Sequence, residues 1–115
     1  MMVDIGSTMK AAVVYGPRDL RIEDVEVPKI QSTEVLIKVK AIGVCPSDVR
    51  SYEGIYFRKM YDWGRDSFGL TGHEWSGEIV KVGSAVKDYN IGDRVIAETI
   101  IPCGTCKFCN KGLTN

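Results

Sequence analysis

The sequence lacks both a long hydrophobic run and an excess of charge of one sign. Its longest uninterrupted apolar stretch, residues 11–15, is far shorter than the roughly 20 residues that a membrane-spanning helix needs. Fifteen Lys and Arg residues balance fifteen Asp and Glu residues, so no net charge favours nucleic acid or an anionic membrane. Residues 1–8 have neither the basic cluster nor the apolar core of a secretory signal. We therefore expect a cytoplasmic protein that binds no membrane and no nucleic acid.

Helical periodicity is also scarce, and short strands dominate the pattern. Alternating apolar residues between turn-forming residues predict strands at residues 10–15, 20–27, 35–41, 75–82 and 93–99. At 115 residues the chain accommodates one compact domain at most. The sequence predicts a mainly β protein, an antiparallel barrel or sandwich. We expect residues 1–8 to be a leader and residues 9–115 to be the domain.

Irregular pairing is expected in the second of these strands. The period of two slips across Glu23 and Asp24, which predicts a bulge or break there. Pro28 lacks a backbone N–H and therefore favours a sheet edge for this strand. In the third strand, residues 35–41, the alternate apolar residues are expected to share one face, with two lysines on the other.

A short helical turn and a long loop are expected between the third and fourth strands. Pro46 suits the first position of a helix, which would carry the residues up to Arg50. Residues 54–70 mix aromatic, charged and glycine residues without a sustained period, which is typical of a surface loop.

Three cysteines stand three residues apart near the end of the sequence: Cys103, Cys106 and Cys109. This spacing brings thiolates together around one ion and favours zinc. A tetrahedral structural site needs four ligands, and no fourth cysteine follows. The bacterial iron–sulfur pattern would place a cysteine and then a proline where Leu113 and Thr114 stand. The remaining alternatives are a chance cluster of cysteines and a redox dithiol with a spare thiol.

The cysteine outside the triplet, Cys45, and the single histidine, His73, form a second candidate pair. Cys45 and His73 are each close to glycines that favour turns. An isolated cysteine is usually a small buried hydrophobic residue, and a lone histidine is often a satisfied surface or core residue. By itself the pair gives only weak support for a metal site.

The order of motifs along the chain adds a family resemblance. In sequence order the motifs are Gly43-Val44-Cys45-Pro46-Ser47-Asp48-Val49-Arg50, Gly72-His73-Glu74-Trp75-Ser76-Gly77, Val82-Gly83, Gly92-Asp93-Arg94-Val95 and the cysteine triplet. This order, over residues 9–112, resembles the zinc-dependent medium-chain alcohol dehydrogenase family. The resemblance implies a GroES-like domain, a distorted antiparallel β barrel with short helical turns. In the family a Rossmann domain that binds NAD or NADP follows it.

The resemblance implies a catalytic zinc site within this domain. Cys45 and His73 would bind the ion, Glu74 would be an exchanging or indirect ligand, and a third protein ligand would lie beyond Asn115. In the family, zinc lowers the pKa of a bound alcohol so that the alkoxide can transfer a hydride to nicotinamide.

Two further candidates, Ser47 and Asp48, follow Cys45. By the resemblance, Ser47 would take the proton of the alcohol and Asp48 would orient the histidine ligand; with Glu74 they complete the catalytic candidates. Without the family context, both would be ordinary helix-start residues. Arg50 stands where many members have a relay histidine, and a guanidinium cannot pass a proton on. We therefore expect the proton to leave through water.

Other residues of the motifs are expected either to have structural roles or to differ from the residues that family members have at the same positions. Pro46 occupies a place where some members have a basic residue near the cofactor pyrophosphate, so no such contact is expected. Gly77 and Asp93 are interpreted as residues that shape the fold. The substrate pocket would be lined partly by residues 56–68, which leaves the substrate open.

The same resemblance assigns a second, structural zinc to the cysteine triplet, with a fourth cysteine about eight residues after Cys109. The sequence contains no G-x-G-x-x-G followed by a helical pattern, so no cofactor-binding residue is predicted. We expect a truncated part of a zinc-dependent NAD(P) oxidoreductase acting on an alcohol, polyol or sugar. It would be inactive alone and homo-oligomeric at full length. The alternative is a stand-alone GroES-like module that binds zinc or a partner without catalysis.

Overall fold

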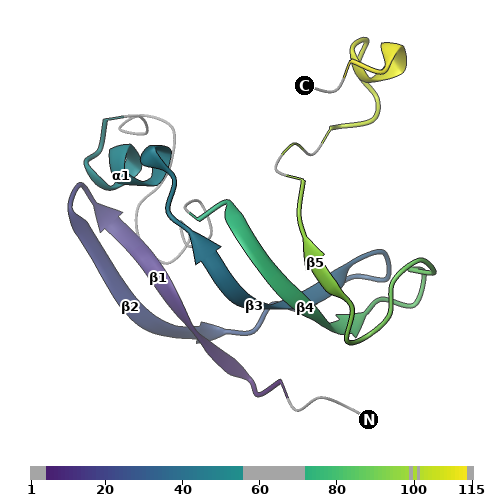
Figure 1. Ribbon diagram of the computed structural model, residues 1–115, viewed down its shortest axis with the longest axis horizontal. Coiled ribbons are helices and arrows are strands. Elements are labelled where there is room, and N and C mark those ends of the chain that lie inside the picture. The colour runs from purple at the N-terminus through teal and green to yellow at the C-terminus, as the bar shows by residue number, and fades with distance from the viewer. Residues whose placement is uncertain (1–4, 56–71, 99, 101, 114–115) are drawn as a thin grey trace.

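Within the described residues the strands form two antiparallel sheets, and a short helix lies beside them (Figure 1). The computed structural model describes residues 5–55, 72–98, 100 and 102–113. Within these residues the elements are β1 (Thr8–Gly16), β2 (Asp19–Glu26), β3 (Val35–Gly43), α1 (Pro46–Tyr52), β4 (Glu74–Val82), β5 (Arg94–Ile96) and a 3₁₀ turn (Cys109–Lys111). The predicted mainly β fold with short helical turns is confirmed.

The first sheet is the hairpin of β1 and β2, in which Val13, Val14 and Val25 are buried. The bulge expected at Glu23 and Asp24 is wrong, because these two residues pair in regular register with β1. The irregularity lies instead between Val14 and Gly16, next to the turn.

The pattern misleads because Leu20 and Ile22 are apolar but exposed, so their positions do not mark the buried face of the strand. Side-chain contacts also join the two strands at this point. The Tyr15 hydroxyl donates to Glu23 Oε1 at 2.6 Å, and Lys10 Nζ lies 2.7 Å from Asp24 Oδ2. The strand ends at Glu26, before Pro28, and forms an edge as predicted.

The second sheet has the order β3-β4-β5, with Ile79 and Val80 of β4 buried. The predicted strand at residues 35–41 is present, but its pairing shifts between Leu36 and Ile37 and again between Val39 and Ala41. These shifts interrupt the expected alternation, and Val39 is 52% exposed. β5 covers Arg94–Ile96 of the predicted residues 93–99, of which Thr99 lies outside the described residues.

Gly77 and Asp93 shape this second sheet, as predicted. A side chain at Gly77 would meet Ile37 Cγ2 at 2.5 Å and the Lys38 carbonyl oxygen at 2.7 Å, so only glycine lets β3 approach here. The Asp93 carboxylate accepts the N–H of Asn90 at 2.8 Å and closes the turn before β5. Neither contact involves the candidate metal ligands.

The helix and the cysteine triplet lie at separate places in the fold. α1 begins at Pro46, as predicted, and packs above the end of the β1–β2 hairpin (Figure 1). The segment 102–113 projects away from both sheets. Most of the loop expected at residues 54–70, and with it the expected substrate-lining residues 56–68, lies outside the described residues.

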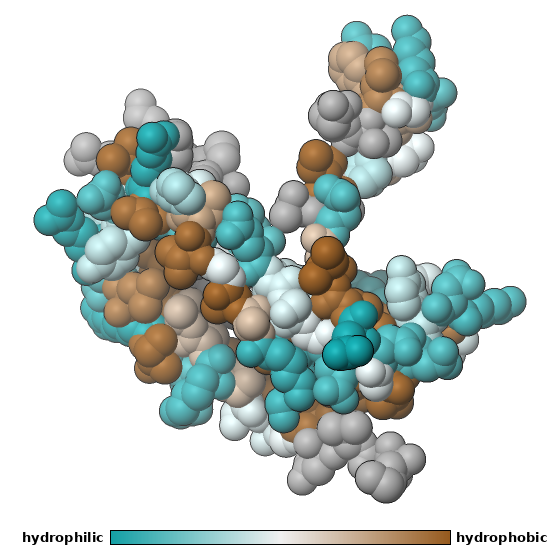
Figure 2. Space-filling model, in the orientation of Figure 1, coloured by the Kyte–Doolittle hydropathy of each residue, from teal (hydrophilic) through white to brown (hydrophobic). Residues whose placement is uncertain are grey.

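No helix in the described part of the chain is long and apolar enough to cross a bilayer. Apolar side chains nevertheless gather on the surface where the hairpin, the end of β3 and α1 meet (Figure 2). Leu20, Ile42, Val44 and Val49 are all exposed there. Together with Ala12 and Tyr52 they border a groove of about 320 Å³.

Candidate metal centre and active site

Cys45 lies at the junction between β3 and α1, where the chain changes from extended to helical conformation. It is the N-cap residue of α1, with φ −78° and ψ 150°, and Pro46 begins the helix. The Asp48 carboxylate accepts the N–H of Cys45 at 2.9 Å, while the Asp48 N–H donates to the Cys45 carbonyl at 2.9 Å. This reciprocal arrangement fixes the backbone on which the thiol stands.

His73 and Glu74 reach the same place because β4 pairs with β3. The first residue of β4, Glu74, lies opposite Gly43, the last residue of β3. Gly72 precedes them with φ +78°, a left-handed conformation that favours glycine. Strand pairing therefore brings the Gly-His-Glu motif beside Cys45, although the two are far apart in sequence.

Asp48 joins these two segments. Its Oδ2 holds Cys45, and its Oδ1 accepts the N–H of Gly72 at 3.0 Å. His73 Nδ1 lies 3.5 Å from the same Oδ1. Burial tends to raise the pKa of Asp48, but the N–H groups of Gly72 and Cys45, with His73, outweigh it and hold that pKa below its usual value. Asp48 is therefore ionised at neutral pH.

Three potential ligand atoms converge at this point. One atom each from Cys45, His73 and Glu74 lies within 4.8 Å of the others. Thiolate, imidazole and carboxylate are the donors that zinc takes, and catalytic zinc sites use three protein ligands with one open position. Cys45 is half-buried and the other two are exposed, so a small molecule can reach the cluster. The residues present therefore fit a catalytic zinc ion.

Ser47 and Arg50 lie on α1, on the helical turns that follow Cys45. Ser47 is half-buried in the first turn, and its carbonyl accepts the Ser51 hydroxyl at 2.8 Å. Arg50 is exposed in the last turn. Ser47 follows Cys45 by two residues in the sequence, and its catalytic role stays a prediction.

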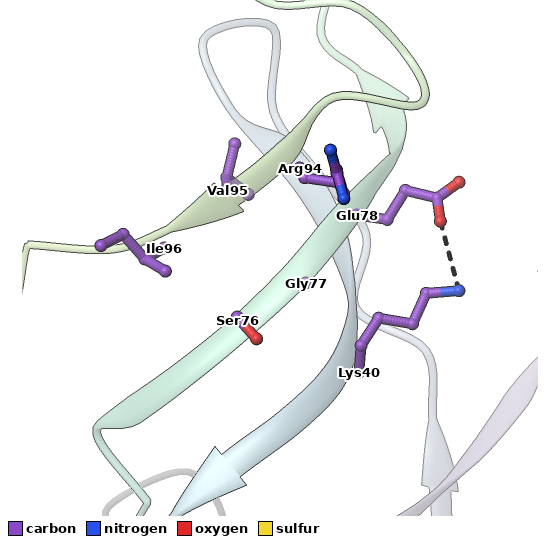
Figure 3. A pocket seen from close by; sticks show the side chains of 7 residues that line it. All are labelled: Lys40, Ser76, Gly77, Glu78, Arg94, Val95 and Ile96. Atoms are coloured by element: carbon purple, nitrogen blue, oxygen red, sulfur yellow. Dashed lines mark ion pairs between the residues drawn. The ribbon is translucent and has the colours of Figure 1, made fainter.

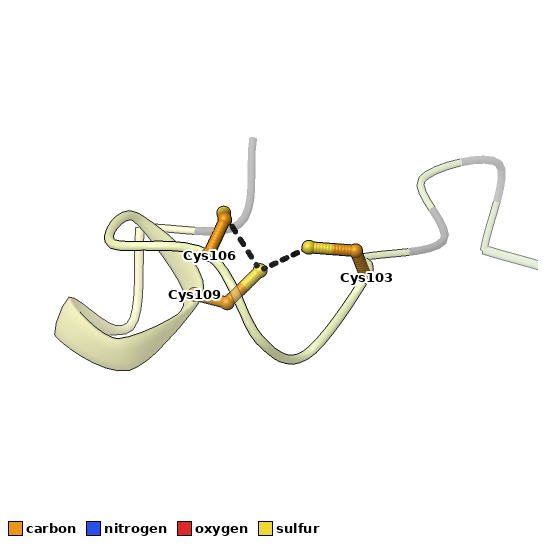
Figure 4. Close-up of side chains that lie close together, drawn as sticks. All are labelled: Cys103, Cys106 and Cys109. Atoms are coloured by element: carbon orange, nitrogen blue, oxygen red, sulfur yellow. Dashed lines mark hydrogen bonds between the residues drawn. The ribbon is translucent and has the colours of Figure 1, made fainter.

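The cysteine triplet forms a second cluster, shown in Figure 4. Cys109 Sγ lies 3.8 Å from Cys103 Sγ and 3.6 Å from Cys106 Sγ. Sulfurs bound 2.3 Å from one tetrahedral zinc ion would be about 3.8 Å apart. The geometry fits a shared ion and the three thiols are free, with no disulfide among the described cysteines.

Backbone N–H groups favour the thiolate form at two of these cysteines. The N–H groups of Thr105 and Cys106 lower the pKa of Cys103 to about 6. Those of Cys109 and Phe108 lower the pKa of Cys106. Both thiols therefore ionise more readily than an ordinary cysteine, and the thiolate is the form that binds metal.

A separate hollow of about 400 Å³ lies over β4 and β5 (Figure 3). Its charged rim includes an ion pair between Lys40 Nζ and Glu78 Oε2 at 3.2 Å, with Arg94 beside it. Lys40 lies at the second shift in the pairing of β3 with β4 and has no residue of β4 opposite it. None of the predicted ligands lines this hollow, so it gives no further support for the site.

Two contacts at the site were not predicted from the sequence. The bond from Gly72 to Asp48 depends on strand pairing, and only the glycine next to His73 indicated a special backbone there. The approach of Gly43 to Glu74 Oε2 likewise follows from the register of β3 and β4. No spacing rule within one motif could have predicted either contact.

Comparison with known proteins agrees with this geometry. Residues 31–115 match the profile of the alcohol dehydrogenase GroES-like domain. The chain is 40% identical over 111 residues to sorbitol dehydrogenase of Bacillus subtilis (strain 168), which covers 96% of this chain and 31% of that protein. The chain therefore belongs to the zinc-dependent medium-chain alcohol dehydrogenase family and contains its GroES-like N-terminal domain.

Solved structures are similar over the same region. An oxidoreductase/dehydrogenase of unknown specificity from Escherichia coli superimposes with a TM-score of 0.81 at 36% identity, covering 93% of this chain and 30% of that one. A short chain alcohol dehydrogenase from Escherichia coli CFT073, complexed with NADH, gives 0.78 at 34% identity, covering 95% and 30%. The chain thus spans about a third of the length of these relatives.

Proposed function

We propose that the chain is the N-terminal catalytic part of a zinc-dependent NAD(P) oxidoreductase that oxidises an alcohol, polyol or sugar hydroxyl to a carbonyl. The convergence of Cys45, His73 and Glu74 within 4.8 Å carries this proposal. The 40% identity to a sorbitol dehydrogenase supports a polyol as the substrate class. A cytoplasmic location and a homo-oligomeric full-length protein belong to the same proposal.

The side chains of the cluster would hold one zinc ion through Cys45 and His73. Because His73 Nδ1 faces Asp48, its Nε2 is the nitrogen left to bind the metal. The Glu74 carboxylate would be an exchanging ligand beside them. When bound, zinc supplies Lewis acidity toward the substrate hydroxyl.

Ser47 would receive the proton that the substrate hydroxyl loses. Its place two residues after Cys45 puts the hydroxyl on the same helical turn as Asp48. The Ser47 hydroxyl would release its own proton to water, because the guanidinium of Arg50 cannot accept one. Asp48 would act through the backbone of Cys45 and the ring of His73.

The nicotinamide cofactor, NAD or NADP, would be bound by a Rossmann domain that follows this domain. The similar structure complexed with NADH supports this assignment. We expect the 115-residue chain alone to give no alcohol-dependent NAD(P) reduction. The triplet Cys103, Cys106 and Cys109 would hold a second, structural zinc ion.

The test is to express the reading frame through and beyond the codon for Asn115 and to assay the product with sorbitol and NAD⁺ or NADP⁺. We expect NAD(P)H formation, loss of activity in Cys45→Ser, and a loss of about 100-fold in Ser47→Ala that Ser47→Thr restores. Full activity in Cys45→Ser would contradict the proposal. A frame that stops at Asn115, giving a folded zinc-binding product without turnover, would support the stand-alone module instead.

A further inference from the structure

Gly43 lies directly opposite Glu74 where β3 and β4 end their pairing. Side chains at opposed positions of an antiparallel pair share one face of the sheet. Here one partner has no side chain, and the Glu74 side chain occupies the free space. A Cβ built on Gly43 would lie 2.7 Å from Glu74 Oε2 and 3.2 Å from Glu74 Cβ.

The first of these distances is too short for any real contact, so an alanine at position 43 would force a movement. The backbone of Gly43 is not in the left-handed region, so an alanine could adopt it without strain. The group that must move furthest is the carboxylate at the end of the flexible Glu74 side chain, whereas the contact with Glu74 Cβ requires a shift of only a few tenths of an ångström. The substitution would therefore displace a potential ligand while leaving the strand pairing in place.

The displaced carboxylate is one of the three converging groups, beside Cys45 and His73. We propose that Gly43 is a positioning residue whose missing side chain opens the slot in which the Glu74 carboxylate lies within the metal cluster. This inference rests on the proposed function, because it assumes that the cluster binds a metal ion. Gly43 itself touches neither metal nor substrate.

The test measures cobalt(II) binding to the 115-residue chain. Cobalt(II) is the probe because its visible spectrum reports ligand type and geometry, whereas zinc has none. The background variant C103S/C106S/C109S removes the triplet, so that the spectrum reports only the Cys45, His73 and Glu74 cluster. Circular dichroism of each variant checks that the strands still form.

Three variants in that background form a double-mutant cycle, and a fourth variant is the control. We expect Gly43→Ala and Glu74→Ala each to weaken cobalt binding about tenfold and to change the visible bands in the same way. The double variant G43A/E74A should bind like E74A, because no carboxylate is left to displace. Gly16→Ala is the matched control, since a Cβ there meets nothing within 4 Å.

The outcomes separate this inference from the proposed function. If the background chain binds no cobalt through Cys45, so that Cys45→Ser leaves the spectrum unchanged, the metal site itself is wrong. If cobalt binds and G43A has the background affinity and spectrum, the positioning role is wrong. If G43A weakens binding by the same factor whether or not E74A is also present, its effect is not exerted through Glu74, and the inference is again overturned.

Discussion

At the scale of single residues, Asp48 connects the two segments that carry the candidate ligands. One carboxylate oxygen accepts the Cys45 N–H, and the other accepts the Gly72 N–H and faces His73. Hydrogen bonds from N–H groups to a carboxylate are stronger than those between neutral groups. Asp48 thus stabilises the fold where the two segments meet and contacts the histidine ring.

We predict that Asp48→Asn lowers the stability of the metal-free chain by about 1–2 kcal/mol at pH 7, because the amide oxygen can replace only one of the two acceptors. The pKa of Asp48 is lowered in the folded protein. Its contribution is therefore complete above the unfolded pKa of about 3.9 and is lost as the pH falls through the folded value. Urea unfolding of both proteins at pH 7 and across pH 5 to 3 measures this.

The difference between the native chain and the variant should be constant above about pH 5 and shrink below about pH 4. Asp88, an exposed carboxylate away from the site, provides a control. Asp88→Asn should change the stability at pH 7 by less than about 0.5 kcal/mol. A stability difference at Asp48 that stays the same down to pH 3 would refute the assigned ionisation.

At the scale of elements, the turn of the β1–β2 hairpin is tied to the end of α1. The Arg18 N–H donates to the Tyr52 carbonyl at 2.6 Å, and the Tyr52 hydroxyl donates to the Arg18 carbonyl at 3.2 Å. Arg18 has φ +63°, a left-handed conformation that disfavours residues with a side chain. The contact holds the helix that carries Ser47 and Asp48, at the expense of backbone strain.

Replacing Arg18 by glycine should relieve this strain. We predict that Arg18→Gly is more stable than Arg18→Ala by about 1 kcal/mol, because both lose the guanidinium but only alanine keeps the left-handed penalty. The exposed ion pair of Arg18 with Glu53 spans 4.0 Å and contributes little. Thermal unfolding of the two variants gives the comparison, and equal midpoints would contradict the strain.

The central strand β4 supplies the second prediction at this scale. Ile79 is 1% exposed, whereas Ile96 on the neighbouring β5 is 79% exposed. We predict that Ile79→Ala costs about 2–5 kcal/mol, because it leaves a cavity in a small core. Ile96→Ala, the matched control, should stay within about 0.5 kcal/mol. Similar unfolding midpoints in urea for the two variants would contradict this account of the core.

Sequence periodicity predicts where these elements lie better than which face they bury. The turns at Gly16 and Asn90 and the helix start at Pro46 depend on neighbouring residues, so local patterns suffice. The faces of β2 and β3 depend on what packs against them, so the pattern predicts a bulge at Glu23 and Asp24 that is absent and misses the shifts in β3. The order of motifs along the sequence identifies the candidate ligands, whereas the pairing of β3 with β4 brings them together.

At the scale of the whole molecule, the cysteine triplet lies on a segment that projects from the sheets (Figure 1). In the part of the chain that the structure describes, residues 102–113 are almost all exposed. Metal binding and local folding are coupled in such segments. The order of this segment should therefore depend on zinc, while that of the sheets should not.

We predict that amides of residues 102–113 exchange with solvent at least about tenfold faster after zinc removal, while those of β4 are unchanged. Hydrogen–deuterium exchange with and without a chelator measures both. Cys106→Ser should abolish the zinc-dependent difference in residues 102–113. Protection of this segment equal to that of β4 in the metal-free chain would contradict the prediction.

The central claim is that this chain supplies ligands to two separate metal sites, one of them catalytic. The most direct measurement is the number of zinc ions bound per chain in competition with a chromophoric chelator. We predict two ions for the native chain, and one each for Cys45→Ser and for C103S/C106S/C109S. Two ions retained in Cys45→Ser would contradict the claim, because the site proposed for catalysis would then not be the one that binds zinc.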